Sequence, residues 1–316
     1  MLFRSKTRQE MRQALKAGIA CFNVESLAEL EVLNQVAVDM GVRAPISIRV
    51  NPDVDAKTHP YISTGLKGNK FGIAHEATLG AYQKAAQMPG LQVVGIDCHI
   101  GSQITEVTPY LDAMDRMLDL VEAIEAQGIA LAHLDFGGGL GIDYQGEQPP
   151  TADHLWTQLL ARLDARGHGQ RQLMLEPGRS LVGNAGVCLT EVVFMKPGPQ
   201  KNFCIVDAAM NDLPRPAMYE AFHQIVPVRE REGSGLVCDV VGPVCESGDW
   251  LGRERTLSVA AGDVLAVLSA GAYCMSMSSN YNTRGRAAEI LVDGAQAHLI
   301  RERESAFDTF TRERLL

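Results

Sequence analysis

The chain has 316 residues, of which 46% are apolar and 21% charged, a composition typical of a globular protein with room for two domains. Acidic residues (38) outnumber basic ones (29), and the net charge of −9 argues against a nucleic-acid or membrane-surface partner. No apolar run reaches the roughly 18 residues of a membrane helix, and the first residues lack the apolar core of a signal peptide. We therefore expect a cytoplasmic protein. Its seven scattered cysteines contain no CxxC pair and indicate reduced thiols.

Up to about residue 183, short apolar runs alternate with amphipathic stretches whose apolar residues lie three and four apart. The runs are 19–24, 46–50, 93–99, 131–136 and 173–176, and the amphipathic stretches are 28–40, 77–88, 110–127 and 152–166. This alternation predicts right-handed βαβ units and a parallel sheet, with ligands at the carboxyl ends of the strands. Five strands are too few for a closed (β/α)₈ barrel, so the pattern alone also allows an open doubly wound sheet.

Residues 184–316 have a different pattern, with β-rich runs separated by Gly, Pro and Asp turns. The runs are 187–195, 203–206, 236–241, 263–268, 289–292 and 297–300. They predict a second, mostly β domain, so we place a domain boundary between residues 183 and 184.

Three segments at the ends of predicted strands carry candidate chemistry. The loop of Gly137, Gly138 and Gly139 could cradle a phosphate with its backbone N–H groups, or be only a tight turn. Glu176 and Arg179 flank Pro-Gly, where they could bind a protonated ring nitrogen and an anion, or form a buried ion pair. His99, followed by Ser102, could stack on a flat cofactor or be an ordinary core histidine. No second ligand at metal spacing accompanies His99, so we expect no metal.

Three segments of the second domain also carry candidates. Cys245 and Glu246 follow a Gly-Pro turn and could transfer a proton, unless the thiol is inert. Arg215 and Tyr219 are four residues apart, so on a helical turn they would share a face and could bind a carboxylate. Tyr273 offers a phenol close to Gly271. A packed or solvated turn remains an alternative for the last two segments.

Together and in this order, these segments resemble the diaminopimelate decarboxylases, which are fold-III pyridoxal-phosphate enzymes. The resemblance runs from about Lys6 to the C-terminus. It is carried by residues 49–53, 59–65, 70–72, 98–103, 137–139, 176–180, 207–212, 242–247 and 269–273. It implies an alanine-racemase-like (β/α)₈ barrel, of the TIM-barrel type, followed by a β domain, and it favours the barrel over the open sheet.

The resemblance also implies a cofactor, pyridoxal 5'-phosphate, and a role for each candidate. The implied cofactor contacts are Ser102, Gly137, Gly138, Gly139, Gly178, Arg179 and Tyr273, with His99 stacked on the ring and Glu176 paired with the pyridinium nitrogen. The implied substrate contacts are Arg179, Arg215, Tyr219, Glu246 and Tyr273. Arg215 with Tyr219 favours a distal carboxylate, and hence diaminopimelate over ornithine or arginine. Cys245 matches the proton donor, which reaches the neighbouring subunit's site in a homodimer.

Two departures from the family pattern affect the expected activity. Pro214 stands where the family usually has a larger aliphatic residue. The family also begins with the first barrel strands and a lysine that forms the Schiff base with the cofactor, and no lysine of this chain lies in such a segment. We therefore expect impaired decarboxylation of meso-2,6-diaminopimelate to L-lysine. The alternatives are a non-catalytic paralogue that modulates a full-length decarboxylase, or a fold-III decarboxylase for another amino acid.

Overall fold

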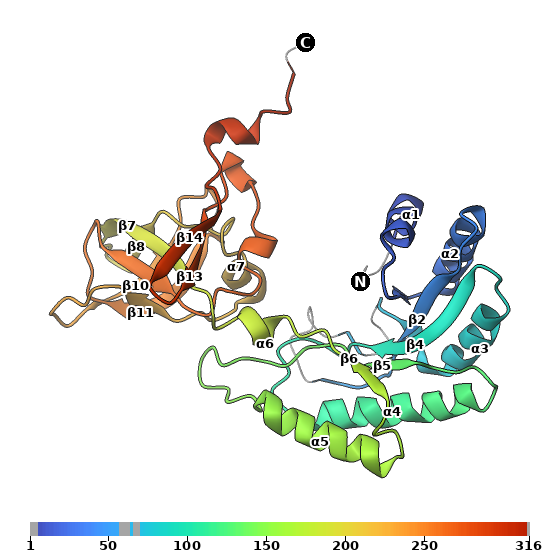
Figure 1. Cartoon of the computed structure of the whole chain (residues 1–316). Helices are drawn as coiled ribbons and strands as arrows, with labels where there is room; N and C mark the ends of the chain where they lie inside the picture. Colours follow the sequence, from blue (N-terminus) through green and yellow to red (C-terminus); the bar gives the residue numbers. More distant parts are fainter. Residues whose placement is uncertain (1–5, 57–63, 66–69, 315–316) are drawn as a thin grey trace. The chain divides into compact units, whose positions relative to one another are not determined.

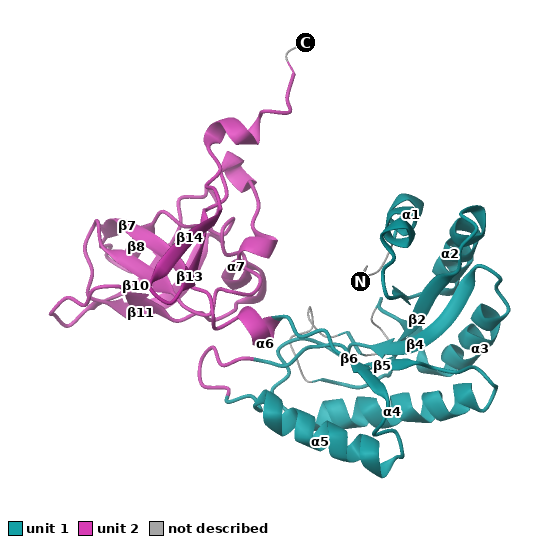
Figure 2. Cartoon of the chain, in the orientation of Figure 1, with its two compact units in different colours: residues 1–141, 148–178 teal, residues 142–147, 179–316 magenta. Residues whose placement is uncertain are grey.

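The computed structural model describes residues 6–56, 64–65 and 70–314 (Figure 1). Residues 59–63, which contribute to the family resemblance, lie outside the described part. The chain divides into two compact units (Figure 2). Unit 1 comprises Met1–Gly141 and Gln148–Gly178, and unit 2 comprises Ile142–Glu147 and Arg179–Leu316. The change of unit at residue 178 lies five residues before the boundary expected from sequence, and the short segment 142–147 belongs to the second unit.

Unit 1 is built on a parallel sheet whose strands follow one another in chain order. Its strands are β1 (Phe22–Val24), β2 (Ala44–Asn51), β4 (Leu91–Cys98), β5 (His133–Asp135) and β6 (Gln172–Met174), with the two-residue β3 (Ile73–Ala74) paired to β2. All five predicted strands are confirmed. A doubly wound sheet reverses its strand order at a switch point, whereas the order β1-β2-β4-β5-β6 has no reversal. The winding is therefore that of the (β/α)₈ barrel, and β1 and β6 are the edge strands of the described sheet.

Five helices accompany these strands, along one side of the curved sheet (Figure 1). They are α1 (Arg8–Ala17), α2 (Leu27–Asp39), α3 (His75–Ala86), α4 (Thr108–Glu125) and α5 (Ala152–Ala165). Helix α1 was not predicted, although Thr7 and Glu10 form a capping box at its start and Gly18 ends it in the left-handed conformation. Helices α2 and α4 bury their apolar faces in the core of the unit, and no helix of the described residues is long and apolar enough to cross a membrane.

Unit 2 is mostly β, as predicted. Its main sheet has the order β11-β10-β8-β7-β12-β9, and a separate hairpin pairs β13 with β14. The strands are β7 (Cys188–Lys196), β8 (Phe203–Val206), β9 (Ile225–Pro227), β10 (Leu236–Val241), β11 (Trp250–Leu257), β12 (Val264–Val267), β13 (Glu289–Asp293) and β14 (Gln296–Arg301). Strands β9 and β11 were not predicted, because β9 has three residues and β11 carries the polar run Gly-Arg-Glu-Arg-Thr. The helical elements are α6 (Arg179–Val182), α7 (Arg215–Tyr219), and the 3₁₀ turns η1 (Met275–Met277), η2 (Tyr281–Thr283) and η3 (Ala306–Thr309).

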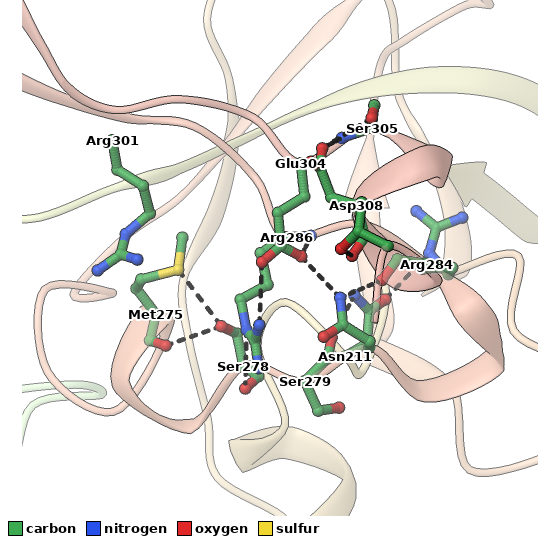
Figure 3. Close-up of polar contacts among 12 residues, drawn as sticks. Asn211, Met275, Ser278, Ser279, Arg284, Arg286, Arg301, Glu304, Ser305 and Asp308 are labelled. Carbon is green, nitrogen blue, oxygen red and sulfur yellow. Dashed lines mark hydrogen bonds and ion pairs between the residues drawn. The ribbon is translucent and has the colours of Figure 1, made fainter. Parts of the chain in front are cut away.

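The loop that leads into α7 is held by the C-terminal part of the chain (Figure 3). Asn211 accepts a hydrogen bond from Arg284 Nε at 3.0 Å and donates to the Ser279 carbonyl at 3.3 Å. Glu304 in turn accepts from Arg286 Nη1 at 3.0 Å and from the Asn280 amide at 2.7 Å. The two bonds of Asn211 hold the segment that precedes α7, and the bonds of Glu304 hold the C-terminal segments together. The backbone position from which the Arg215 side chain extends is therefore held in place.

Candidate active site

A row of charged side chains crosses the sheet of unit 1 near the carboxyl ends of its strands. Arg49, Asp97 and Asp135 occupy one register across β2, β4 and β5, so their side chains point to the same face. Glu25 follows β1, and its carboxylate pairs with Arg49 at 3.0 Å. Glu176 follows β6. Asp97 and Asp135 are only 2% and 1% exposed, so this row is removed from water.

Three carboxylates of this row converge. One oxygen each of Asp97, Asp135 and Glu176 lies within 4.8 Å of the others. Each residue also has a buried oxygen without a hydrogen-bond partner among the described residues: Asp97 Oδ1, Asp135 Oδ2 and Glu176 Oε1. Burial raises the pKa of all three carboxyls, that of Glu176 to about 7 with the charge of Asp135 as the second cause. Such a cluster fits a cationic group, either a protonated ring nitrogen or a metal ion.

The predicted glycine loop lies beside Glu176, and two of its glycines have a positive φ, +68° at Gly137 and +102° at Gly139. A Cβ at Gly138 would collide with the Glu176 carbonyl oxygen, and one at Gly139 with the Gly101 carbonyl oxygen. The Glu176 amide donates to the Gly137 carbonyl at 2.8 Å. The glycines therefore allow the loops after β4, β5 and β6 to approach one another closely.

A hydrogen bond from this loop also determines which ring nitrogen of His99 carries the proton. The Gly138 amide donates to His99 Nδ1 at 3.2 Å, so the proton of the neutral ring lies on Nε2. Burial and the charge of Arg49 lower the His99 pKa to about 4, so the ring is neutral at physiological pH. The Gly137 amide donates to Asp135 Oδ1 at 2.9 Å. Because both amides are engaged, Gly139 is the glycine whose N–H has no acceptor among the described residues.

The predicted cations of unit 2 form a second cluster around an aromatic ring. Arg179 and Arg215 are 5% and 6% exposed. Arg215 lies 4.7 Å from the Tyr144 ring centroid, and Arg179 donates to the Tyr144 hydroxyl at 2.6 Å. Arg179 also lies 4.8 Å from the ring centroid of Tyr273. Tyr219 lies on the same short helix as Arg215, as predicted. Unit 2 therefore gathers these cations and phenols in one anion-attracting cluster.

Cys245 and Glu246 lie elsewhere in unit 2, on an exposed loop. Asp249 holds this loop, since its carboxylate accepts from the Val244 amide at 2.6 Å and the Met210 amide at 2.7 Å. The Tyr281 hydroxyl donates to Glu246 at 2.6 Å. No contact joins Cys245 to the arginine cluster within the described part of the chain, so the role of its thiol in proton transfer stays a prediction.

Sequence reasoning missed several residues of these clusters. Asp97 and Asp135 lie inside predicted buried strands, where an acidic residue is unusual and could have been noticed. Arg49 was assigned no role. Tyr144 and His223, which contacts Arg215, gave no signal, because their positions depend on which loops the fold brings together.

Comparison with known proteins defines the class. The family described as "Pyridoxal-dependent decarboxylase, pyridoxal binding domain" matches residues 3–183, more than half of the chain. The chain belongs to the pyridoxal-dependent decarboxylase family. Its cofactor is therefore pyridoxal phosphate, and Glu176, with its unpartnered buried oxygen, fits the protonated ring nitrogen of that group.

Within this family the chain is a member of the diaminopimelate decarboxylases. It is 55% identical to the diaminopimelate decarboxylase of Pseudomonas aeruginosa over 98% of its own length and 74% of the relative's. The crystal structure of the M. jannaschii enzyme matches with a TM-score of 0.92 and 40% identity, over 99% of this chain and 73% of that one. The Helicobacter pylori enzyme complexed with L-lysine matches with a TM-score of 0.91 and 39% identity, over 97% and 76%. The predicted fold-III architecture is confirmed. These relatives lend no support to the expected impairment or to either alternative function.

Proposed function

We propose that the chain decarboxylates meso-2,6-diaminopimelate to L-lysine. The observation that carries this proposal is the buried, unpartnered Glu176 oxygen beside a glycine loop and a neutral His99. Pyridoxal phosphate, when bound, supplies an electron sink for the electron pair left behind as carbon dioxide departs. The reaction breaks one carbon–carbon bond and adds one proton to the same carbon.

Unit 1 supplies the groups that hold the cofactor ring. Glu176 would hold the ring nitrogen in its protonated form, because an ionised carboxylate beside that nitrogen favours the positive charge. His99 provides a flat, uncharged face, whose orientation is fixed by the bond from Gly138. Gly139 and Ser102 would donate to the phosphate and Gly178 would also contact the cofactor, while Gly137 and Gly138 let the loops approach one another.

Unit 2 supplies the groups that bind anions. Arg179 and Tyr273 would contact the phosphate and the amino-acid substrate. Glu246, the acidic neighbour of Cys245, would also contact the substrate, although it is not one of the groups that bind its anionic ends. Arg215 and Tyr219 bind the distal carboxylate of diaminopimelate. Ornithine and arginine have no such carboxylate, so Arg215 would remain a buried cation without a counter-ion when they are bound.

Cys245 delivers the proton in this proposal, to the site of a neighbouring subunit in a homodimer in the cytoplasm. Its exposure is in keeping with a group that acts on another chain. The hairpin of β13 and β14 exposes five large apolar side chains that a partner subunit could cover. They are Ile290, Leu291, Val292, Leu299 and Ile300. Light scattering of the purified protein should give twice the mass of one chain.

A substrate panel tests the proposed function. The purified chain, supplied with pyridoxal phosphate, is given diaminopimelate, ornithine or arginine, and carbon dioxide release is measured. We expect release from diaminopimelate alone, with L-lysine as product. Release from ornithine or arginine at a comparable rate, or no release from any of the three, would contradict the proposal.

A further inference from the structure

The hydrogen bonds of His223 define its tautomer. His223 is completely buried and precedes β9. Its Nδ1 lies 2.9 Å from the Leu268 carbonyl oxygen, which can only accept, so Nδ1 carries the proton. Its Nε2 lies 2.7 Å from Arg215 Nη1, which can only donate, so Nε2 is the acceptor. Both bonds require the same neutral tautomer.

The surroundings of His223 keep it neutral. Burial lowers its pKa to about 4, and the charges of Arg215, Arg179 and Arg255 act in the same direction, against the opposing effect of the Leu268 carbonyl. Arg255 also donates to the His223 carbonyl at 3.0 Å. The Tyr144 ring meets the imidazole edge-on, with centroids 5.2 Å apart. A protonated ring would lose its acceptor and place a cation against Arg215, so the neutral acceptor persists at physiological pH.

Arg215 itself has few other partners. A guanidinium has five N–H donors, yet His223 and the face of Tyr144 are the contacts of the Arg215 guanidinium within the described residues. No carboxylate pairs with Arg215 in the described part of the chain. Its remaining N–H groups are available to a ligand, while one end of the guanidinium is already fixed.

We propose that His223 is a positioning residue that fixes the Arg215 guanidinium, and thereby sets the preference for ligands with a distal carboxylate. The link runs from the Leu268 carbonyl through the imidazole to Arg215, so the end of β12 determines the orientation of a side chain on α7. The inference rests on the proposed function, because it assigns the distal carboxylate to Arg215. His223 touches neither the cofactor nor the substrate in this role.

Two variants of His223 separate positioning from packing. His223→Gln places an amide oxygen near the position of Nε2 and keeps an acceptor for Arg215. His223→Asn keeps a donor for Leu268, but its side chain is too short to reach Arg215. Both bury a neutral amide, and thermal unfolding reports any general loss of structure. His298→Gln, on the exposed strand β14, is the control.

The readout is binding of L-lysine and of cadaverine to the protein supplied with pyridoxal phosphate, measured by calorimetry. L-lysine keeps the carboxylate that Arg215 would bind, and cadaverine lacks it. We expect His223→Asn to weaken L-lysine binding about 10-fold, or about 1.4 kcal/mol, and cadaverine binding less than 2-fold. His223→Gln should remain within about 3-fold of the unchanged protein for both ligands.

Other outcomes locate the error. Equal weakening of both ligands, or equal effects of Gln and Asn, would reduce His223 to a packing role and overturn the inference. If Arg215→Gln also leaves L-lysine binding unchanged, the assignment of the distal carboxylate fails as well. Nitrogen NMR of His223 needs no ligand, and a protonated Nε2 or a pKa near the ordinary value of His would overturn the inference by itself.

Discussion

The two units bury ionisable groups of opposite kind, acidic in unit 1 and basic in unit 2. Unit 1 places the carboxylates of Asp97, Asp135 and Glu176 around one sheet face, where Arg49 is already paired with Glu25. Unit 2 buries Arg179 and Arg215 against tyrosines and a histidine. A buried charge without a counter-charge in the described residues, such as that of Arg215, is costly, and a ligand of opposite sign relieves that cost. Unit 1 is therefore suited to a ring nitrogen or ammonium group, and unit 2 to phosphate and carboxylate.

The largest expected effect comes from the glycine loop, because Gly138→Ala would break the arrangement of unit 1. Its methyl group would collide with the Glu176 carbonyl oxygen. We expect a loss of about 2–3 kcal/mol of unfolding free energy and no measurable pyridoxal-phosphate binding, assayed by denaturant unfolding and absorbance titration. Gly80→Ala in helix α3 is the control, since its Cβ meets nothing within 4 Å. If Gly138→Ala bound the cofactor as well as the Gly80 variant, the assignment of this loop would be wrong.

A second prediction weakens the anion preference of unit 2. Arg215→Gln removes a buried cation, and we expect L-lysine to bind about 30-fold more weakly, or about 2 kcal/mol, by calorimetry. Arg229→Gln removes an exposed cation and changes the net charge by the same amount, so it should have no effect on L-lysine binding. A similar loss in both variants would mean that overall charge, not the buried cluster, attracts the ligand.

The third prediction uses pH to isolate the carboxylates of unit 1. The pKa of Glu176 is raised to about 7 from an ordinary value near 4.5, so its contribution to stability is present at low pH and is lost as pH rises between these values. Asp97, Asp135, Arg49 and Glu25 are the charged groups around it. In cofactor-free protein, Glu176→Gln should remove this loss. The unfolding free energy of the variant minus that of the unchanged protein should therefore be larger at pH 8 than at pH 4.5, by at most about 3 kcal/mol.

Denaturant unfolding at both pH values measures this difference. Glu302→Gln, which changes an exposed carboxylate, should follow the unchanged protein at every pH. His99 and His223 have lowered pKa values and contribute stability that rises with pH from about 4. The comparison between variants removes this opposing effect, because both variants keep these histidines. If the unfolding free energies of all three proteins changed with pH in the same way, the surroundings of Glu176 would not raise its pKa.

The smallest effect is expected for Asp97→Asn. This change removes one acidic group from the buried row at constant size, so cofactor-free protein should gain about 1 kcal/mol of unfolding free energy at pH 8. Pyridoxal phosphate should bind no better, since the negative charge around its ring nitrogen decreases. A thermal unfolding series with and without the cofactor checks both statements, and a destabilised Asp97→Asn would contradict the first.

The fold was more accessible to sequence reasoning than the site. Apolar periodicity identified all five main strands of unit 1, because burial imposes a pattern along a single segment. The short β9 and the polar β11 carry no such pattern and escaped it. Among the site residues, Gly138 and Glu176 could be identified from sequence, because each lies in a recognisable turn at the end of a predicted strand. Tyr144 does not, since its contacts with Arg179 and Arg215 come from segments far apart in the chain.

The excursion of residues 142–147 into unit 2 affects how the molecule can be divided. The chain passes between the units three times, after residues 141, 147 and 178. A gene truncated after Gly178 would retain Tyr144 while deleting both arginines and the imidazole that surround it, leaving an orphaned aromatic loop. A single proteolytic cut at any one crossing would leave the other two as covalent connections between the units. Each unit is compact, but it is built from two separate segments of the chain. Neither unit could therefore be replaced by exchanging one continuous stretch of sequence.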